Sequence, residues 1–359
     1  MPNSKPDFKI PHATCIVFLM AVRMKDIAKD LGLSVVTISK VLRNHPDIAE
    51  ATRERVLKRV RELDYQPNLM ARSLVTGRSY LIGLVVPTVL HPFFAEVAMA
   101  LSSVVTKRGY SLLLASSEEQ PELEAREIQQ LMARQLDALV IASCATDTAA
   151  LEKLARNGSP YVLIDREIAG LAAHFVGVDD IEAGRIATEH LIEQGCKRIA
   201  HLRGRDTSTG NKRHDGYRLA LHKHAIEYRE SLVVSSPWVD IDGIRQGTEA
   251  IRKLLAADAV PDAVFAYNDP MAIGAMRAIL DAGLRIPEDI ALVGCGNLHY
   301  DGLLRVPLTS IDQHSAAIGE RTAQILLQLI ESKTPPQPAS VILSPSLIVR
   351  ASSQRKPTL

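Results

Sequence analysis

The sequence predicts a small all-α helix-turn-helix headpiece followed by a two-lobed α/β body with two doubly wound parallel sheets. Within residues 24–67, three short stretches carry apolar residues at helical spacing, and a Gly-containing turn separates the first two. Between residues 80 and 352, short apolar runs of strand length alternate with helical patterns. The alternation begins again near residue 178, which indicates two parallel-sheet units of similar size.

The headpiece begins with two short helices around a tight turn. Residues 24–31 form the first helical pattern, and Gly32 suits the left-handed residue that ends a helix. Ser34 suits the N-cap of the second helix, residues 35–42. This order of elements predicts that the second helix is a recognition helix, which reads bases in the major groove of DNA.

A third helix completes the headpiece, and a linker follows it. The helix near residues 50–63 is predicted to bury four apolar side chains, Val56, Leu57, Val60 and Leu63. Pro67 ends the headpiece, because proline cannot continue a helix. Residues 68–79 are predicted to form a short hinge helix and a polar linker.

These segments resemble, in order and spacing, the headpiece and hinge of the LacI/GalR family of bacterial transcription repressors. The matching stretches are DIAKDLGLSVVTISKVL, TRERV, YQPNLMARSL and a GRS linker, and the resemblance continues to about residue 352. It implies a periplasmic-binding-protein-like body that binds a small-molecule effector between its lobes. It also implies a homodimer on a pseudo-palindromic DNA operator, and neither a cofactor nor a metal is expected.

Base reading is expected chiefly from Val35 and Val36, the first two residues of the recognition helix. Apolar side chains contact thymine methyl groups but cannot make the bidentate hydrogen bonds of arginine or glutamine. Three polar residues of the same helix are expected to bind phosphates instead: Thr37, Ser39 and Lys40.

The hinge is predicted to fold only on the operator, because a helix of about two turns is unstable alone in water. The resemblance implies that two hinge helices meet across the dimer axis and enter the minor groove. Leu74 matches the leucine that is pushed between base pairs, which kinks the duplex. The other hinge contacts implied are Asn68, Ala71 and Arg72.

The charge distribution agrees with DNA binding by one end of the chain. Residues 24–78 hold eleven Lys/Arg and seven Asp/Glu, whereas residues 79–359 hold 28 and 33. A basic module on a mildly acidic body suits phosphate binding.

The four cysteines form no CxxC pair, which argues against metal or disulfide roles and fits a cytoplasmic protein. No stretch reaches the ~18 apolar residues that span a membrane.

Residues 1–23 are predicted to be a disordered extension or the product of a misassigned start, with Met24 as the natural beginning. An export signal is the alternative, because two lysines precede an apolar run over residues 13–22. Arg23 leads directly into the first helix, however, which leaves no room for a cleavage site.

The body repeats short buried strands and helices in order along the chain. Strands are predicted at residues 81–87, 111–115, 138–142, 161–165, 198–202, 232–235, 263–266, 290–293, 308–311 and 347–350. Helices are predicted at residues 91–109, 123–135, 151–157, 183–194, 215–224, 243–256, 271–282 and 316–330. The resemblance implies three crossings between the lobes, near Val178, Ile311 and Pro338. The expected segments are an N-lobe of residues 80–177 and 312–337, a C-lobe of residues 178–311 and 338–352, and a tail of residues 353–359.

Ligands of such folds bind beside the loops at the carboxyl ends of the parallel strands. The resemblance places six effector contacts there: Phe93, Asp165, Arg213, Trp238, Asn268 and Asp269.

Each of these residues also has a purely structural interpretation. Arg213 could form a surface ion pair, and Asp165 could cap the turn that follows it. Asn268 and Asp269 could cap the next helix, and Trp238 could be a core residue. Phe93 and its neighbour Phe94 cannot both bind a ligand, so one of them is expected to pack in the core.

One departure from the family pattern bears on the effector. Gly296 stands where the family usually has an aspartate after VGY or VGF, so a carboxylate that binds sugar hydroxyls or a purine is missing. A sugar or sugar derivative is the expected effector, with a slight preference for an acidic or modified sugar.

Two other function classes are compared with a ligand-responsive DNA-binding regulator. An exported sugar-binding receptor shares the two-lobed architecture, but it has no use for the headpiece of residues 24–78. An enzyme is not expected, because the chain has no GxGxxG opening a helix and no GxxxxGK[ST], HExxH or GxSxG motif.

Overall fold

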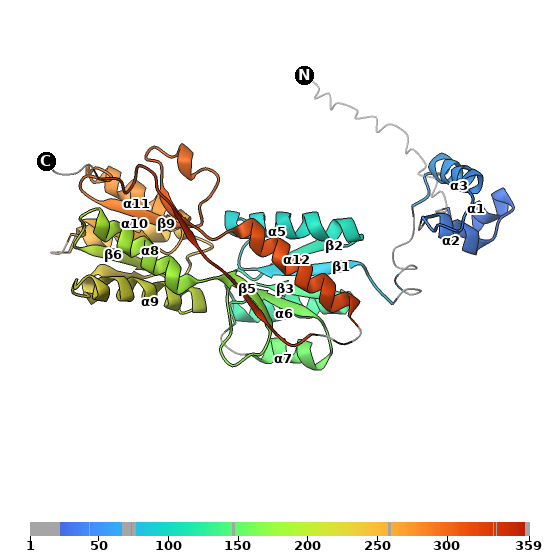
Figure 1. The fold of residues 1–359 in the computed structure, drawn as a ribbon, viewed down its shortest axis with the longest axis horizontal. Coiled ribbons are helices and arrows are strands. Elements are labelled where there is room, and N and C mark those ends of the chain that lie inside the picture. Colours follow the sequence, from blue (N-terminus) through green and yellow to red (C-terminus); the bar gives the residue numbers. More distant parts are fainter. Residues whose placement is uncertain are drawn as a thin grey trace, which may run out of the picture. The chain divides into compact units, whose positions relative to one another are not determined.

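The computed structural model describes residues 22–42, 44–66, 73, 77–145, 148–257, 260–332, 334 and 336–355. The chain divides into two compact units, Met1–Gly77 and Arg78–Leu359 (Figure 1). The hinge residues Asn68, Ala71, Arg72 and Leu74, and residues 1–21, lie outside the described residues. Within the described part of the chain, every helix is too short or too polar to cross a membrane.

In the part of the first unit that the structure describes, three short helices surround one small core. They are α1 (Met24–Leu31), α2 (Val35–Leu42) and α3 (Glu50–Glu62). The turn between α1 and α2 is the predicted one: Gly32 has φ 65°, and the Oγ of Ser34 accepts a hydrogen bond of 3.0 Å from the backbone N–H of Thr37. Ile27, Ile38 and Val56, one from each helix, are fully buried and hold the helices together.

The prediction that Leu57 is buried was wrong. Its side chain is 37% exposed, whereas Val56 is fully buried and Val60 and Leu63 pack partly against the core. Successive residues of an α-helix point about 100° apart, so a helix that buries Val56 turns Leu57 toward its edge.

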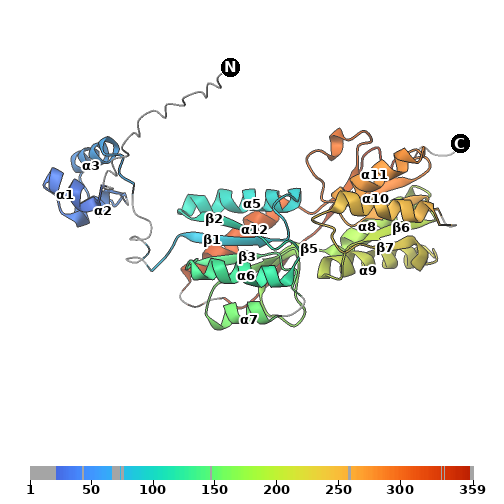
Figure 2. The same cartoon turned by 180° about the vertical axis from the view of Figure 1, so that it is seen from behind.

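The second unit contains two lobes, each with a sheet of mainly parallel strands between two layers of helices (Figures 1 and 2). The N-lobe sheet has the strand order β11-β5-β4-β3-β1-β2. Its strands are β1 (Leu81–Val86), β2 (Ser111–Ser116), β3 (Ala138–Ile141), β4 (Tyr161–Ile164), β5 (His174–Val178) and β11 (Ser340–Leu343). Its helices are α5 (Pro92–Val105), α6 (Pro121–Ala133), α7 (Ala149–Arg156) and α12 (Ser315–Glu331).

The apolar runs of these strands supply a core to each face of the sheet. In β1, Ile82 and Leu84 pack with α5 and α12, and Val85 packs on the other face with α6 and α7. Side chains alternate between the faces of a strand, so a strand that is covered on both faces must be apolar throughout.

The C-lobe repeats this plan with the strand order β12-β10-β9-β8-β6-β7. Its strands are β6 (Ile199–Arg203), β7 (Val233–Ser235), β8 (Ala263–Ala266), β9 (Ala291–Cys295), β10 (Thr309–Asp312) and β12 (Ser346–Ile348), the last antiparallel to β10. Its helices are α8 (Asp180–Glu193), α9 (Ser208–Lys223), α10 (Gly243–Leu255) and α11 (Asp269–Asp281). Helices α8 and α9 cover one face, and α10 and α11 cover the other.

The third crossing between the lobes lies later than predicted. It was placed near Pro338, but residues 340–343 form β11, which pairs in parallel with β5 of the N-lobe. The chain therefore crosses after Leu343. Strands β5 and β11 were not predicted. Strand β11 is the edge strand of the sheet and β5 is its neighbour. Strand β11 is only partly buried, so it has no continuous apolar run to mark it.

Candidate functional site

The start of α2 presents an apolar surface to solvent. Val35 is 46% exposed and Val36 is 62% exposed, whereas Ile38 of the same helix is fully buried. Exposed valines at the first turn of a recognition helix have no packing role in the isolated unit. They are available for the methyl and base-edge contacts of a major groove.

The polar residues of α2 are already engaged in the free chain. The Oγ1 of Thr37 lies 2.8 Å from the Oγ of Ser34, and the ammonium of Lys40 lies 2.5 Å from the carboxylate of Asp47. Ser39 is half-buried. A phosphate bound by Lys40 must therefore compete with Asp47 for the ammonium.

In the second unit, Arg213 is buried on α9 and bound within the C-lobe. Its Nε donates a hydrogen bond of 2.8 Å to the carboxylate of Asp180, and its Nη1 donates one of 2.7 Å to the carbonyl of Tyr267. The guanidinium also lies 4.7 Å from the centroid of the Tyr267 ring. The surface ion pair considered for Arg213 is excluded, because the residue is only 2% exposed.

Asn268 has two roles. Its Oδ1 accepts the hydrogen bond of the Met271 N–H at 3.0 Å and so caps α11. Its Nδ2 lies 3.3 Å from Nε2 of His91, which belongs to the N-lobe, and 3.4 Å from Oδ1 of Asp240. Because the amide nitrogen is a donor, Nε2 of His91 is the acceptor, and the ring is neutral. Burial lowers the pKa of His91, which favours the same form.

Two of the six predicted effector residues make their contacts elsewhere, and a third is partly exposed. Asp269 bonds to the Oγ of Ser310 at 2.7 Å inside the C-lobe. Phe93 is buried in the N-lobe core, where its ring meets Phe94 edge-on at 5.1 Å. Trp238 is 41% exposed, so it is not a core residue.

Sequence reasoning missed the residue that joins the lobes most directly. Arg166 directly follows the predicted Asp165 after β4, and it is only 1% exposed. Its guanidinium pairs with the carboxylate of Asp240, in the C-lobe loop before α10. It also lies 3.6 Å from Oε1 of Glu119, in the N-lobe turn after β2. The available signal was an arginine two residues after the apolar strand YVLI.

Two carboxylic acids of this cluster have perturbed pKa values. Burial, reinforced by the charge of Asp240, raises the pKa of Glu119 to about 7. Burial also raises the pKa of Asp165 to about 7, against the opposing effect of Arg166. Both groups therefore titrate near neutral pH, which is typical of functional sites.

The cluster of Glu119, Asp165, Arg166, Asp240, His91 and Asn268 is called the interlobe cluster below. Backbone and surface contacts flank it. The N–H of Glu167 donates a hydrogen bond of 2.9 Å to the Oγ of Ser208 on α9, and Lys212 pairs with the carboxylate of Glu167. Among the described residues, no group of three or more His, Cys, Asp or Glu side chains is arranged to hold a metal ion.

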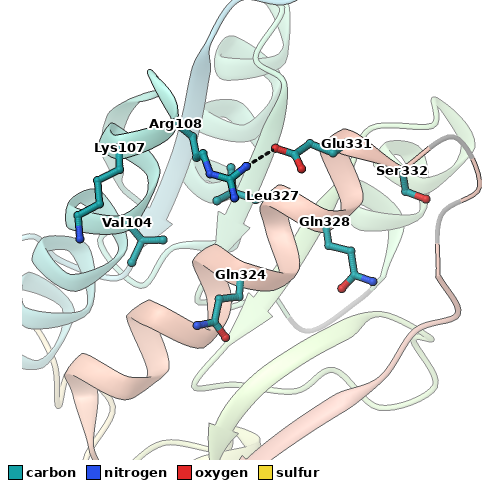
Figure 3. Close-up of a pocket in the computed structure, with 8 residues that line it drawn as sticks. All are labelled: Val104, Lys107, Arg108, Gln324, Leu327, Gln328, Glu331 and Ser332. Carbon is teal, nitrogen blue, oxygen red and sulfur yellow. Dashed lines mark hydrogen bonds and ion pairs between the residues drawn. The ribbon is translucent and has the colours of Figure 1, made fainter.

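A separate cavity of about 530 Å³ lies on the N-lobe, between the C-terminal halves of α5 and α12 (Figure 3). Val104 and Leu327 form its apolar part, and the ion pair of Arg108 with Glu331 crosses it at 3.0 Å. None of the predicted effector residues lines this cavity. This cavity is therefore separate from the residues that were predicted to bind an effector.

Two family models match the chain. The model for periplasmic binding proteins and the sugar binding domain of the LacI family matches residues 79–350, and the model for bacterial regulatory proteins of the lacI family matches residues 23–68. The HTH-type transcriptional repressor PurR of Pasteurella multocida (strain Pm70) is 32% identical over 331 residues, which are 92% of this chain and 98% of the relative. PurR of Haemophilus influenzae (strain PittEE) is 31% identical over 335 residues, with the same coverage.

Solved structures agree with these matches. The Lac repressor dimer bound to operator and the anti-inducer ONPF superposes with a TM-score of 0.81 at 26% identity, covering 93% of this chain and 100% of that one. The complex of the transcriptional regulator CelR with cellobiose gives a TM-score of 0.70 at 31% identity, with coverage of 92% and 99%. The two-unit architecture predicted from the sequence is confirmed by these similarities.

Proposed function

Because the chain belongs to the LacI family of bacterial regulatory proteins, we propose that it is a repressor whose operator affinity is set by a sugar or sugar derivative bound between its lobes. The observation that carries the proposal is the interlobe cluster, where buried charged groups of both lobes meet. A ligand that changes these contacts changes how the lobes are held, and it does so far along the chain from the DNA-reading helix. Such a regulator acts in the cytoplasm and is not an enzyme.

At the DNA, the proposed base readers are Val35 and Val36, and the proposed phosphate contacts are Thr37, Ser39 and Lys40. The exposure of the two valines supports their assignment. The proposed hinge contacts are Asn68, Ala71, Arg72 and Leu74, with Leu74 as the wedge in the minor groove of a pseudo-palindromic operator. Replacing Leu74 by alanine is expected to weaken operator binding and reduce the bend of the DNA.

The proposed effector contacts are Asp165 and Asn268 of the interlobe cluster and Arg213 near Asp165, with Phe93, Trp238 and Asp269 as the remaining assignments. Asn268 supports this set best, because its amide contacts both Asp240 and the N-lobe residue His91. A purine is the alternative effector, since relatives of this chain are named PurR.

We further propose that the chain acts as a homodimer through an apolar surface of the N-lobe. A groove of about 340 Å³ lies there between α5 and the strands β1 and β2. Met99 and Leu114 line it and are largely exposed. A second copy of the chain would cover these side chains, and two headpieces would then match the two halves of an operator.

The test measures operator binding and ligand response in the same preparation. DNA from upstream of the chain's own gene is titrated by fluorescence anisotropy, with and without sugars and purines. Arg213→Ala is expected to retain operator binding and lose the ligand response. Arg108→Ala, at the surface pair of Figure 3, is the matched control and should retain both. A ligand response unchanged in Arg213→Ala would remove this residue from the site, and a chain that binds no DNA would overturn the function.

A further inference from the structure

The strands of both lobes have their carboxyl ends at the boundary between the lobes. Arg166, after β4, pairs with Asp240 of the C-lobe, and the ring of His91, after β1, lies 3.3 Å from the amide of Asn268, after β8. The amino ends of the N-lobe strands therefore lie at the opposite end of that lobe. The chain enters the lobe at this end, at the start of β1, and we call it the linker end.

Three contacts fix the last residues of the linker to this end. The carboxylate of Asp137, just before β3, accepts hydrogen bonds from the backbone N–H groups of Ser79 at 2.9 Å and Tyr80 at 3.0 Å. The guanidinium of Arg78 donates one of 3.1 Å to the carbonyl of Ile330, in the last turn of α12. The point at which the chain leaves for the headpiece is therefore held on the surface of the N-lobe.

Three cationic side chains at the linker end are exposed and unpaired. Lys107 precedes β2, Arg134 is the C-cap of α6 before β3, and Lys153 lies in the last turn of α7 before β4. Among the residues that the structure describes, these side chains have no hydrogen-bond or ion-pair partner. The strand order β4-β3-β1-β2 places them on both sides of the linker, along a row of strands about 14 Å wide.

Two glutamates at this end already have arginine partners. Arg108 pairs with Glu331 at 3.0 Å, and Arg156 pairs with Glu152 at 3.5 Å. Figure 3 shows Lys107 next to the first of these pairs but outside it. Neither glutamate is therefore available to neutralise the three free cations, although the second unit as a whole is mildly acidic.

Cations at helix ends also have an ordinary role, because they offset the partial negative charge of the last carbonyl groups. Arg252 and Lys253, in the last turn of α10, do so in the C-lobe, on the side away from the lobe boundary. The linker end differs in its short connection to the headpiece. Residues 67–77 number eleven, and eleven residues span at most about 40 Å. DNA held by the headpiece is therefore kept near the linker end, where its phosphates are at high local concentration.

We propose that the linker end of the N-lobe is a second DNA-binding surface, on which Lys107, Arg134 and Lys153 contact phosphates in addition to those held by the headpiece. The proposal rests on the function proposed above and adds a contact surface to it. Ammonium and guanidinium groups bind phosphates without reading bases, so this surface adds affinity but no sequence preference. An acidic protein would suit the same charges, but the linker ties DNA to this end and ties no such protein to it.

The test compares three variants of the full-length chain, each changed at three exposed positions. The neutral variant is Lys107→Gln/Arg134→Gln/Lys153→Gln, and the charge-preserving variant is Lys107→Arg/Arg134→Lys/Lys153→Arg. The control variant removes the same charge from exposed C-lobe residues that precede β6 and β8: Arg198→Gln, Arg252→Gln and Lys253→Gln.

Fluorescence anisotropy measures binding to the operator fragment and to a random duplex of equal length, at about 50 and 200 mM salt. The neutral variant is expected to bind both duplexes about fivefold more weakly than the wild type at the lower salt concentration. This deficit should shrink about fourfold at the higher one, as the loss of about one phosphate contact predicts. The charge-preserving and control variants should bind like the wild type.

Wild-type affinity in the neutral variant would overturn the proposal. An equal loss in the control variant would also overturn it, because it would show a general effect of net charge. So would a loss limited to the operator, since phosphate contacts do not depend on sequence. Melting temperatures like that of the wild type show that the variants are folded. A wild type that binds neither duplex would overturn the function proposed above, and this surface with it.

Discussion

Val35 and Val36 are apolar and exposed, whereas Arg166 and Glu119 are charged and buried. Both pairs depart from the usual partition of side chains between surface and interior. An exposed valine pair adds little to the stability of the headpiece, and a buried charge lowers the stability of the lobe that contains it. Residues of this kind are therefore expected to be explained by binding partners and not by packing.

The first prediction concerns the valines. Replacing Val35 or Val36 by alanine should change operator preference. The binding free energy should change by about 1–3 kcal/mol at the base pair that the side chain contacts. Lys40→Ala should instead weaken binding to all DNA sequences alike. It should also reduce the slope of log binding constant against log salt concentration by about one, because one phosphate contact is lost. Selection from a random DNA pool measures the preference. An unchanged consensus site for the Val35/Val36 double variant would exclude these residues as base readers.

The second prediction concerns pH. Asp301 is fully buried beside Asp269, and burial raises the pKa of Asp301 to about 9. Its carboxyl group holds a proton more tightly in the fold than in the unfolded chain. The free energy of unfolding should therefore fall as pH rises from about 4, the ordinary value, to about 9. Asp301→Asn removes this titration and should lose less stability over that range.

The matched control for this measurement is Asp289→Asn. Hydrogen bonds from Arg285 lower the pKa of Asp289 to about 2, so its stabilisation is fully present above the ordinary value of about 4 and is lost only in stronger acid. This variant should change melting temperature equally at all pH values between about 5 and 9. Identical pH profiles for the wild type and Asp301→Asn would contradict the assignment to Asp301.

At the scale of elements, the contact between α8 and α9 positions Arg213. A methyl group on Gly184 of α8 would collide with the backbone carbonyl oxygen of Arg213, so the two helices approach as closely as they do only because glycine is present. Gly184→Ala should lower the free energy of unfolding by about 1–3 kcal/mol, as overpacked cores do. It should also weaken the effector response, because Arg213 must move.

Thermal unfolding and ligand titration measure the two effects. Gly302→Ala is the control, since the nearest atom to its added methyl group, Nε of Arg350, is 3.9 Å away. Equal melting temperatures for the two variants would show that the α8–α9 contact has room for a methyl group at Gly184.

At the scale of the whole molecule, the proposed dimer surface explains why the N-lobe exposes large apolar side chains. Met99 is 71% exposed beside the groove of α5, β1 and β2. Met99→Glu should place a charge in the interface and dissociate the dimer at micromolar concentration, which sedimentation velocity measures. Leu219→Glu changes an exposed apolar residue outside this surface and should leave the dimer intact. A dimeric Met99→Glu protein would locate the interface elsewhere.

The sequence by itself determined the elements whose signals are local. The bounds of α1 and α2 agree with the prediction, because Gly32 and Ser34 mark the turn and apolar spacing marks each helix. The central strands were recognisable for a similar reason: burial on both faces requires continuous apolar runs. Strands β5 and β11, near one edge of the N-lobe sheet, were not predicted, and β11 lacks such a run.

Only the tertiary structure decided which charged residues meet between the lobes. Arg166 and Asp240 are 74 positions apart, and Glu119 comes from a third segment, so no window of sequence brings them together. The same holds for Asp269, which was predicted to face the effector but bonds to Ser310, 41 positions later in the chain. Helix caps and periodicity depend on a few neighbouring residues. The partner of a buried charge depends on how distant strands and loops are brought together, and that is fixed only by the tertiary fold of each lobe and by the contacts between the lobes.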